Sequence, residues 1–302
     1  MSNIIALIWD FDKTLVDGYM QDPIFEDYGI DGKAFWAETD TLPAKYEREQ
    51  GIRVNRETIY LNQFINYAHD GRLAGLNNAV LTDYGKKQRF YPGVPQIFSI
   101  TKELLQNDKR YREQDIRVEH YIVSTGFAAV IKGSAAYEYV DGVWGCEFIE
   151  APAQDGKPVI SEIAYTIDNT TKTRAIFEIN KGVGRIDGIN VNSSIQKDLR
   201  RVPFENMIYI GDGPSDVPAF SVVNQYGGAT FAVYPAGNSK ALNQVVSLRM
   251  QHRINMYAEA NFTEGSLACM WLCEKIRHIA DGIIRKRNDI IKHGISDAPI
   301  NL

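Results

Sequence analysis

Two aspartates, Asp10 and Asp12, directly follow an apolar run near the start of this chain of 302 residues. The run, Ile4–Trp9, is short and continuous and is stopped by polar residues, which predicts a buried parallel strand. Ligands of open α/β sheets bind beyond the carboxyl ends of such strands. We therefore expect the two carboxylates to lie where a phosphate or a metal ion binds. The pattern D-x-D-x-T alone also fits a surface turn in which aspartates cap backbone amides.

Other polar groups follow two later apolar runs in the same manner. Ser124 and Thr125 come after the run at 120–123. The segment Gly211-Asp212-Gly213-Pro214-Ser215-Asp216 comes after the run at 207–210. Each feature alone has an ordinary explanation, because serine suits a turn or a helix cap and a glycine-rich segment suits a loop. Their joint occurrence at successive strand ends predicts one site, shared with the two aspartates of the first strand.

A lysine could supply positive charge to this site, and the chain offers two candidates. Lys172 stands at the start of a helix predicted over 173–180, and alone it also suits a solvated surface position. Lys181 stands in Asn180-Lys181-Gly182, where a basic residue before a glycine is typical of a helix C-terminus. We favour Lys172 and keep Lys181 as the alternative.

Carboxylates clustered this closely repel one another, and a hard divalent cation relieves the repulsion. Mg²⁺ takes few protein oxygens, which suits the side chains of Asp10 and Asp212 together with the backbone carbonyl of Asp12. Asp216 follows Asp212 by one helical turn and is expected to face the same site. It could bind the metal or orient Lys172.

Taken together, these motifs resemble the haloacid dehalogenase-like (HAD) hydrolase superfamily, most closely its phosphoserine-phosphatase-like branch. The matching residues are Asp10-Phe11-Asp12-Lys13-Thr14, Val123-Ser124-Thr125-Gly126, Lys172 and Gly211-Asp212-Gly213-Pro214-Ser215-Asp216. As a set they are specific for the superfamily and far less specific for a substrate. The resemblance implies a Rossmann-like core with a helical cap inserted after the first motif.

The resemblance also implies a chemistry for the first motif. Asp10 would be the nucleophile that forms an aspartyl-phosphate. Asp12 would protonate the leaving alkoxide and later deprotonate the attacking water. A halide leaving group needs no proton, and dehalogenases similar to this chain lack an acid at the position of Asp12. The second aspartate therefore favours phosphate ester hydrolysis.

The remaining residues are implied to bind phosphate, to hold the metal or to support these groups. They are Ser124, Thr125 and Lys172 for the phosphate, Asp10, Asp12 and Asp212 for Mg²⁺, and Asp216 and Thr14 as supporting residues. We therefore expect a Mg²⁺-dependent phosphatase that acts on a small phosphorylated metabolite. Two alternatives stay open: a phosphotransferase that uses the same intermediate, and a catalytically silent protein that binds a phosphorylated ligand.

The pattern of elements divides the chain into three parts. A doubly wound parallel α/β core is predicted over 1–17 and 90–250, because strand-like runs alternate with helical ones there. The stretch 18–89 is polar, aromatic and helical in pattern and is the predicted cap. A C-terminal helical extension is predicted over 251–302. Its apolar stripe must pack on the core or on a second copy of the chain, so a homodimer through this helix is a candidate.

Six side chains of the predicted cap are candidates for contacting the substrate, although each also suits a packing or surface role. They are Trp36, Tyr46, Arg48, Arg53, Arg56 and Arg72. The substrate class suggested by family analogy is a phosphorylated amino acid or a similar small metabolite.

Composition narrows the partners further. A net charge of −5 disfavours a nucleic-acid binder, which would need a basic surface. No apolar stretch approaches the ~18 residues needed to cross a bilayer. The N-terminus lacks the basic and apolar regions of a signal peptide. We expect a cytoplasmic protein with neither a membrane nor a nucleic acid as partner.

Overall fold

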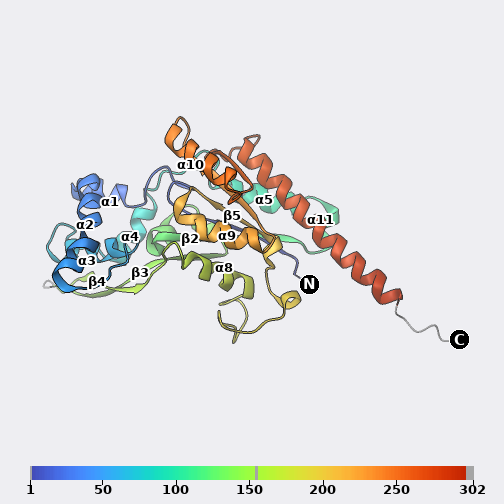
Figure 1. The fold of residues 1–302 in the computed structure, drawn as a ribbon, viewed down its shortest axis with the longest axis horizontal. Helices are drawn as coiled ribbons and strands as arrows, with labels where there is room; N and C mark the ends of the chain where they lie inside the picture. The colour runs from blue at the N-terminus through green and yellow to red at the C-terminus, as the bar shows by residue number, and fades with distance from the viewer. Residues whose placement is uncertain (1, 154–155, 297–302) are drawn as a thin grey trace.

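The computed structural model describes residues 2–153 and 156–296 of the chain (Figure 1). Its centre is a seven-stranded sheet with the strand order β4-β3-β2-β1-β5-β6-β7. Neighbouring strands are parallel except for β3 and β4, which are antiparallel. The strands are β1 (Ile4–Trp9), β2 (Arg117–Phe127), β3 (Gly142–Pro152), β4 (Pro158–Tyr165), β5 (Met207–Gly211), β6 (Ala229–Tyr234) and β7 (Met256–Glu259). The predicted doubly wound α/β core is confirmed.

Strand β1 lies in the middle of this sheet, and all six of its residues are buried, as its unbroken apolar run predicts. Trp9 pairs with Ile122 of β2 on one side and with Ile210 of β5 on the other. The chain first proceeds from β1 to β2 and β3, and later returns to the opposite side of β1 to form β5 and β6. The strand order therefore reverses at β1, which is the place where open α/β sheets bind ligands.

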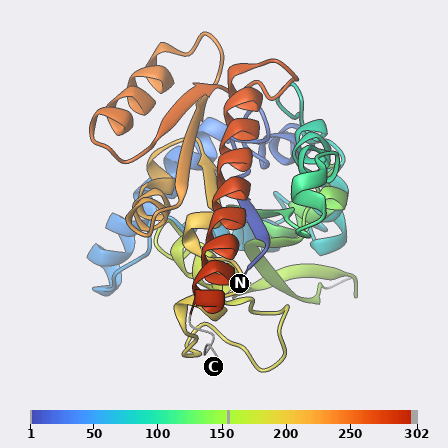
Figure 2. The ribbon, with the colours of Figure 1, turned by 90° about the vertical axis from the view of Figure 1, so that its right-hand side faces the viewer.

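Helices cover both faces of the sheet. Helices α5 and α11 pack against each other on one face, and α8 and α9 do so on the other (Figures 1 and 2). The helices outside the cap region are α5 (Gln96–Gln106), α6 (Lys109–Arg112), α7 (Ala128–Gly133), α8 (Lys172–Lys181), α9 (Val217–Gln225), α10 (Ser239–Met250) and α11 (Leu267–Ser296). None of the described helices is long and apolar enough to cross a membrane.

The segment inserted after β1 is helical, as predicted from its pattern. It contains α1 (Asp22–Tyr28), α2 (Gly32–Gln50), α3 (Ile59–His69) and α4 (Asn78–Gly85). Phe25, Phe35 and Phe64 pack as a cluster of rings with centroids 4.9–5.6 Å apart. Phe64 also packs at 4.9 Å on Phe127 at the end of β2. This aromatic packing joins the cap to the carboxyl ends of the core strands.

The C-terminal region differs from the expected helical extension. Residues 256–259 form β7, which pairs in parallel with β6 and adds an edge strand to the core sheet. Only Ala258 of this strand is buried, so it lacks the apolar run by which the other strands were recognised. Helix α11 runs along the core (Figure 2) and buries Leu272 and Ile276 against it, so its apolar stripe packs on its own chain. A homodimer through this helix stays a prediction.

Candidate active site at the carboxyl ends of the central strands

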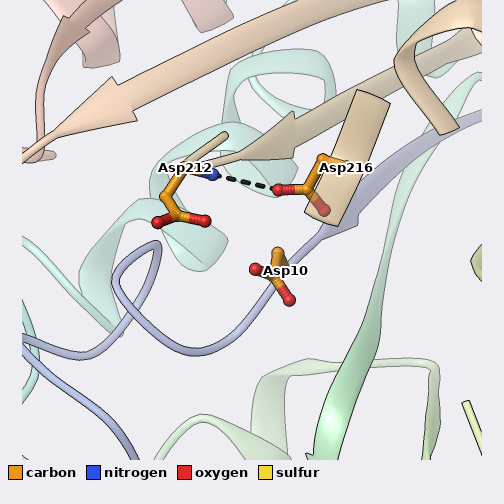
Figure 3. Close-up of side chains that lie close together, drawn as sticks. All are labelled: Asp10, Asp212 and Asp216. Atoms are coloured by element: carbon orange, nitrogen blue, oxygen red, sulfur yellow. Dashed lines mark hydrogen bonds between the residues drawn. The ribbon is translucent and has the colours of Figure 1, made fainter. Parts of the chain in front are cut away.

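Three carboxylates converge where β1 and β5 end (Figure 3). Asp10 follows β1 directly, and its backbone N–H donates to the carbonyl oxygen of Ile210 in β5 at 2.8 Å. Asp212 follows β5 directly, and Asp216 ends the short 3₁₀ turn Pro214–Asp216. One carboxylate oxygen from each of Asp10, Asp212 and Asp216 lies within 4.8 Å of the other two. The parallel register of neighbouring strands thus brings together groups that are about 200 residues apart in sequence.

Lys172 is the positive charge at the centre of this cluster. It is the first residue of α8 and is fully buried, with its Nζ 2.8 Å from Oδ1 of Asp10 and 2.7 Å from Oδ1 of Asp216. Burial alone would lower the pKa of Lys172, but the adjacent Asp10 and Asp216 carboxylates outweigh it and raise that pKa. The alternative, Lys181, donates instead to the carbonyl oxygens of Val191 and Ser193 in the loop after α8. Of the two lysines, Lys172 contacts the carboxylates.

Asp216 is held by hydrogen bonds on both of its oxygens. Its Oδ1 accepts from Lys172 and from the hydroxyl of Tyr209 at 2.8 Å, and its Oδ2 accepts from the backbone N–H groups of Asp212 and Gly213. A Cβ at Gly211 would lie 2.2 Å from Oδ2 of Asp216, so only glycine permits this approach. Asp216 therefore fits a role in orienting Lys172 better than a role as a metal ligand.

Asp10 and Asp212 offer the carboxylate oxygens that a hard cation binds. Burial raises the pKa of Asp212, and repulsion from Asp216 and Asp10 adds to this rise. Burial also raises the pKa of Asp10, although Lys172 opposes the rise. Within the described part of the chain, no hydrogen bond reaches the Asp212 carboxylate. An all-oxygen pair whose negative charge is incompletely compensated is a suitable set of ligands for Mg²⁺.

Asp12 stands apart from this cluster and has a different environment. Its Oδ1 accepts a hydrogen bond from the backbone N–H of Met20 at 2.8 Å. Burial, followed by repulsion from Asp10, raises the pKa of Asp12 to about 8. The next residue, Lys13, adopts a left-handed conformation with φ of 57°, which is uncommon for a residue other than glycine. The two aspartates of one motif thus differ, because Lys172 contacts Asp10, whereas Asp12 forms no ion pair with a described lysine or arginine and feels Lys172 only from farther away.

Ser124 and Thr125 lie in β2 beside Asp10. The β2–β3 pairing is irregular between Val123 and Phe127, so the backbone departs here from a regular ladder. Ser124 is buried, and its Oγ accepts from the backbone N–H of Gly126 at 3.0 Å. The supporting residue Thr14 is also buried, and its Oγ1 has no partner among the described residues. In the β1–β2 pairing Trp9 lies opposite Ile122, so Ser124 lies one residue beyond the position opposite Asp10.

A cavity of about 220 Å³ opens on the cap side of Asp12. Its walls come from the loop after β1, from the cap, from β2 and from the loop before α8. The lining residues are Asp12, Tyr19, Gln21, Trp36, Glu57, Tyr60, Thr125 and Asn169. Two contacts hold the cap over this space: the Tyr60 hydroxyl donates to the Thr125 carbonyl at 2.6 Å, and Glu57 accepts from the backbone and side-chain N–H groups of Asn169.

Of the six cap residues proposed to contact substrate, Trp36 lines this cavity. Tyr46 and Arg53 line a separate surface pocket, and Arg72 binds Asp70. Arg48 is exposed beside Glu49, and Arg56 is exposed as well. No sequence pattern indicated Gln21, Glu57 and Asn169, which come from three separate segments, or Tyr209. The position of Tyr209 in a buried strand, two residues before the glycine–aspartate motif, was the one available signal.

No protein-family model matches the chain. An uncharacterized protein from Borreliella burgdorferi is 38% identical over 287 residues, which cover 91% of this chain and 97% of that protein. A HAD family hydrolase from Salmonella enterica subsp. enterica serovar Typhi aligns over 90% of this chain and 71% of its own, with a TM-score of 0.53 and 13% identity. A substrate-bound phosphoserine phosphatase gives a weaker likeness, with a TM-score of 0.45 and 16% identity over 84% of this chain and 91% of its own. The chain therefore belongs to the same family as the Borreliella burgdorferi protein, and its fold is that of the HAD hydrolases.

Proposed function

We propose that this protein is a Mg²⁺-dependent phosphatase that hydrolyses a small phosphomonoester through an aspartyl-phosphate on Asp10. The observation that carries the proposal is the contrast between the two aspartates of the first motif. Asp10 is paired with Lys172 at 2.8 Å, whereas the pKa of Asp12 is raised to about 8. A carboxylate beside a carboxylic acid is the pair that nucleophilic attack and leaving-group protonation require.

In the first step, a carboxylate oxygen of Asp10 attacks the phosphorus atom and forms a P–O bond. The bond from phosphorus to the alkoxide oxygen breaks, and Asp12 gives its proton to that oxygen. The alcohol then leaves. With a pKa of about 8, Asp12 carries this proton at neutral pH in the free protein.

In the second step, water attacks the phosphorus atom of the aspartyl-phosphate and Asp12 accepts the proton of that water. The P–O bond to Asp10 breaks, inorganic phosphate is released, and both aspartates return to their starting states. Asp12 thus serves as acid and then as base, and the proton balance closes over the two steps.

The neighbouring groups bind and orient the phosphoryl group. Lys172 contributes a fixed positive charge, and Asp216 and Tyr209 determine its position. Ser124 and Thr125 would donate to phosphoryl oxygens from β2. Asp10, Asp212 and the backbone carbonyl of Asp12 would hold Mg²⁺. When bound, Mg²⁺ would neutralise part of the charge on the carboxylates and the phosphoryl oxygens.

The test is phosphate release from p-nitrophenyl phosphate by the wild type and by Asp10→Asn, with Mg²⁺ or EDTA. We expect turnover that requires Mg²⁺ and falls by about 10³-fold or more in the variant, because the nucleophile is lost. Asp40→Asn, an exposed position on α2, is the matched control and keeps full activity.

Two results would overturn part of the proposed function. Phosphate transfer that needs an added alcohol, with no release to water, indicates the phosphotransferase. Unchanged turnover in Asp10→Asn refutes the aspartyl-phosphate mechanism.

A further inference from the structure

The cavity beside Asp12 is the space available to the leaving group. Asp12 lines this cavity and is the proposed donor of the proton to the leaving oxygen, so the alcohol part of the substrate must extend into it. A volume of about 220 Å³ suits a small alcohol. The side chains around it therefore select the substrate, an argument that rests on the proposed function.

Aromatic rings form one part of the cavity wall. The ring of Trp36 lies 5.9 Å from that of Tyr19 and 5.6 Å from that of Tyr60, measured between centroids. Tyr60 is almost fully buried, and its position is held by the hydrogen bond from its hydroxyl to Thr125. The faces of such rings attract ammonium groups, most strongly where water is excluded.

Hydrogen-bond acceptors form another part. Gln21 is 2% exposed, and its Oε1 has no hydrogen-bond partner among the described residues. That oxygen is enclosed by protein atoms, so it is not itself an acceptor open to a ligand in the cavity. Glu57 adds a carboxylate, which two hydrogen bonds from Asn169 hold at the rim of the cavity. A carboxylate has about four lone-pair positions, so Glu57 can accept further donors.

Positive charge is missing from the wall of this cavity. Among the described residues, neither a lysine nor an arginine lines it. The nearest basic group in this loop is Lys13, whose Nζ lies 3.8 Å from the centroid of the Tyr19 ring and donates to the Tyr19 hydroxyl. A substrate carboxylate would therefore meet Glu57 and aromatic faces without an arginine or a lysine in the wall.

We propose that the substrate is the phosphate monoester of an amino alcohol, whose ammonium group binds between Trp36, Tyr60 and Glu57. The aromatic faces stabilise the cation, and Glu57 supplies the opposite charge. This class differs from a phosphorylated amino acid, because no lysine or arginine among the described residues of the cavity wall can pair with the carboxylate of an amino acid.

The test compares ligands that differ in charge but little in shape. Their binding to Asp10→Asn, which cannot form the proposed intermediate, is measured by titration calorimetry with Mg²⁺ present. O-phosphoethanolamine is compared with n-propyl phosphate, and phosphocholine with 3,3-dimethylbutyl phosphate. Phosphoglycolate provides an anionic ligand.

We expect at least one cationic ester to bind about tenfold or more tightly than its neutral counterpart, and phosphoglycolate to bind more weakly than either member of that pair. Adding Glu57→Gln or Trp36→Leu reduces this preference several-fold. Glu49→Gln, an exposed position on α2, keeps the preference and is the control.

Equal or tighter binding of both neutral esters, or preference for phosphoglycolate, overturns the inference. Turnover of p-nitrophenyl phosphate by the wild type is measured separately. If the protein prefers the cationic esters but releases no phosphate, the inferred binding site stands and the proposed phosphatase activity is wrong. If the protein releases phosphate but shows no preference, the phosphatase activity stands and only the inferred substrate class is wrong.

Discussion

Replacing Lys172 by methionine removes the buried ammonium but keeps most of the side-chain volume. The lysine is fully buried, and its Nζ lies within 2.8 Å of two carboxylates that are themselves almost fully buried. Removing one partner of a buried ion pair costs about 3–5 kcal/mol, since the other partner is left without compensation. Here Asp10 and Asp216 would then face each other. We expect the free energy of unfolding to fall by about 3–5 kcal/mol at pH 8, which a typical domain survives.

The loss should also depend on pH. Lys172 opposes the rise in the pKa of Asp10, so its removal raises that pKa further above the unfolded value. A carboxyl group with a raised folded-state pKa contributes stability at low pH and loses it as the pH rises through that pKa. The deficit of Lys172→Met relative to the wild type is therefore smaller at pH 5 than at pH 8.

Urea unfolding in EDTA at the two pH values measures both quantities. Lys181→Met is the matched control, because it removes a lysine from the same helix whose Nζ donates only to backbone carbonyls at 2.6 and 2.8 Å. It is expected to cost at most about 2 kcal/mol, with little change between pH 5 and pH 8. Equal losses for the two variants, or a Lys172→Met deficit that is the same at both pH values, would refute the electrostatic account of this cluster.

Three further predictions concern the other buried groups. Asp12→Asn should slow the first step, release of the alcohol in a single turnover, by about 10²–10⁴-fold for alkyl phosphates but much less for p-nitrophenyl phosphate, because nitrophenolate leaves without a proton; equal losses in this step on both substrates would contradict the acid role. Asp212→Asn should raise the melting temperature of the metal-free protein, since burial raises the pKa of Asp212, and should abolish the further rise on adding Mg²⁺; a rise with Mg²⁺ as large as in the wild type would exclude Asp212 as a ligand. His120 is buried between Trp9 and Thr101, and burial lowers its pKa to about 3. The unfolded state therefore takes up a proton at this histidine below pH ~6.5, so between pH 7 and pH 5 the wild type should lose about 2 kcal/mol more than His120→Gln, as seen by urea unfolding; parallel losses would mean that His120 is protonated in the folded state.

The sequence was sufficient to predict where the carboxylates lie. Asp10 and Asp212 each end an apolar run, and buried parallel strands align such ends without further information. The position of Lys172 was predicted from the family resemblance together with its place at a helix start. Its two ion pairs depend on how α8 packs under the sheet, which no local pattern encodes.

Residues that act through a single long-range contact could not be predicted. In the sequence, Tyr209 cannot be distinguished from the apolar residues of β5, and only the structure shows that its hydroxyl donates to Asp216. Gln21 and Glu57 become neighbours of Asp12 through the folding of the cap over the core. Strand β7 was missed for a different reason: at the edge of the sheet a strand needs few buried residues, so the pattern that predicts central strands is absent there.

The cost of burying these acids and the use proposed for them have one physical origin. Asp10, Asp12 and Asp212 have raised pKa values because burial removes the water that would stabilise their charges. The Asp216 carboxylate accepts hydrogen bonds from Lys172, from Tyr209 and from the backbone of the glycine–aspartate loop, and Lys172 also pairs with Asp10. These contacts leave the carboxylates of Asp10 and Asp212 short of positive charge, and they leave Asp12 protonated near neutral pH. A metal ion and a phosphoryl group would supply what the first pair lacks, and a leaving alkoxide would take the proton that Asp12 holds. The protein alone therefore contains an incompletely compensated cluster of charges, and the proposed substrate with its metal would form the state that compensates it.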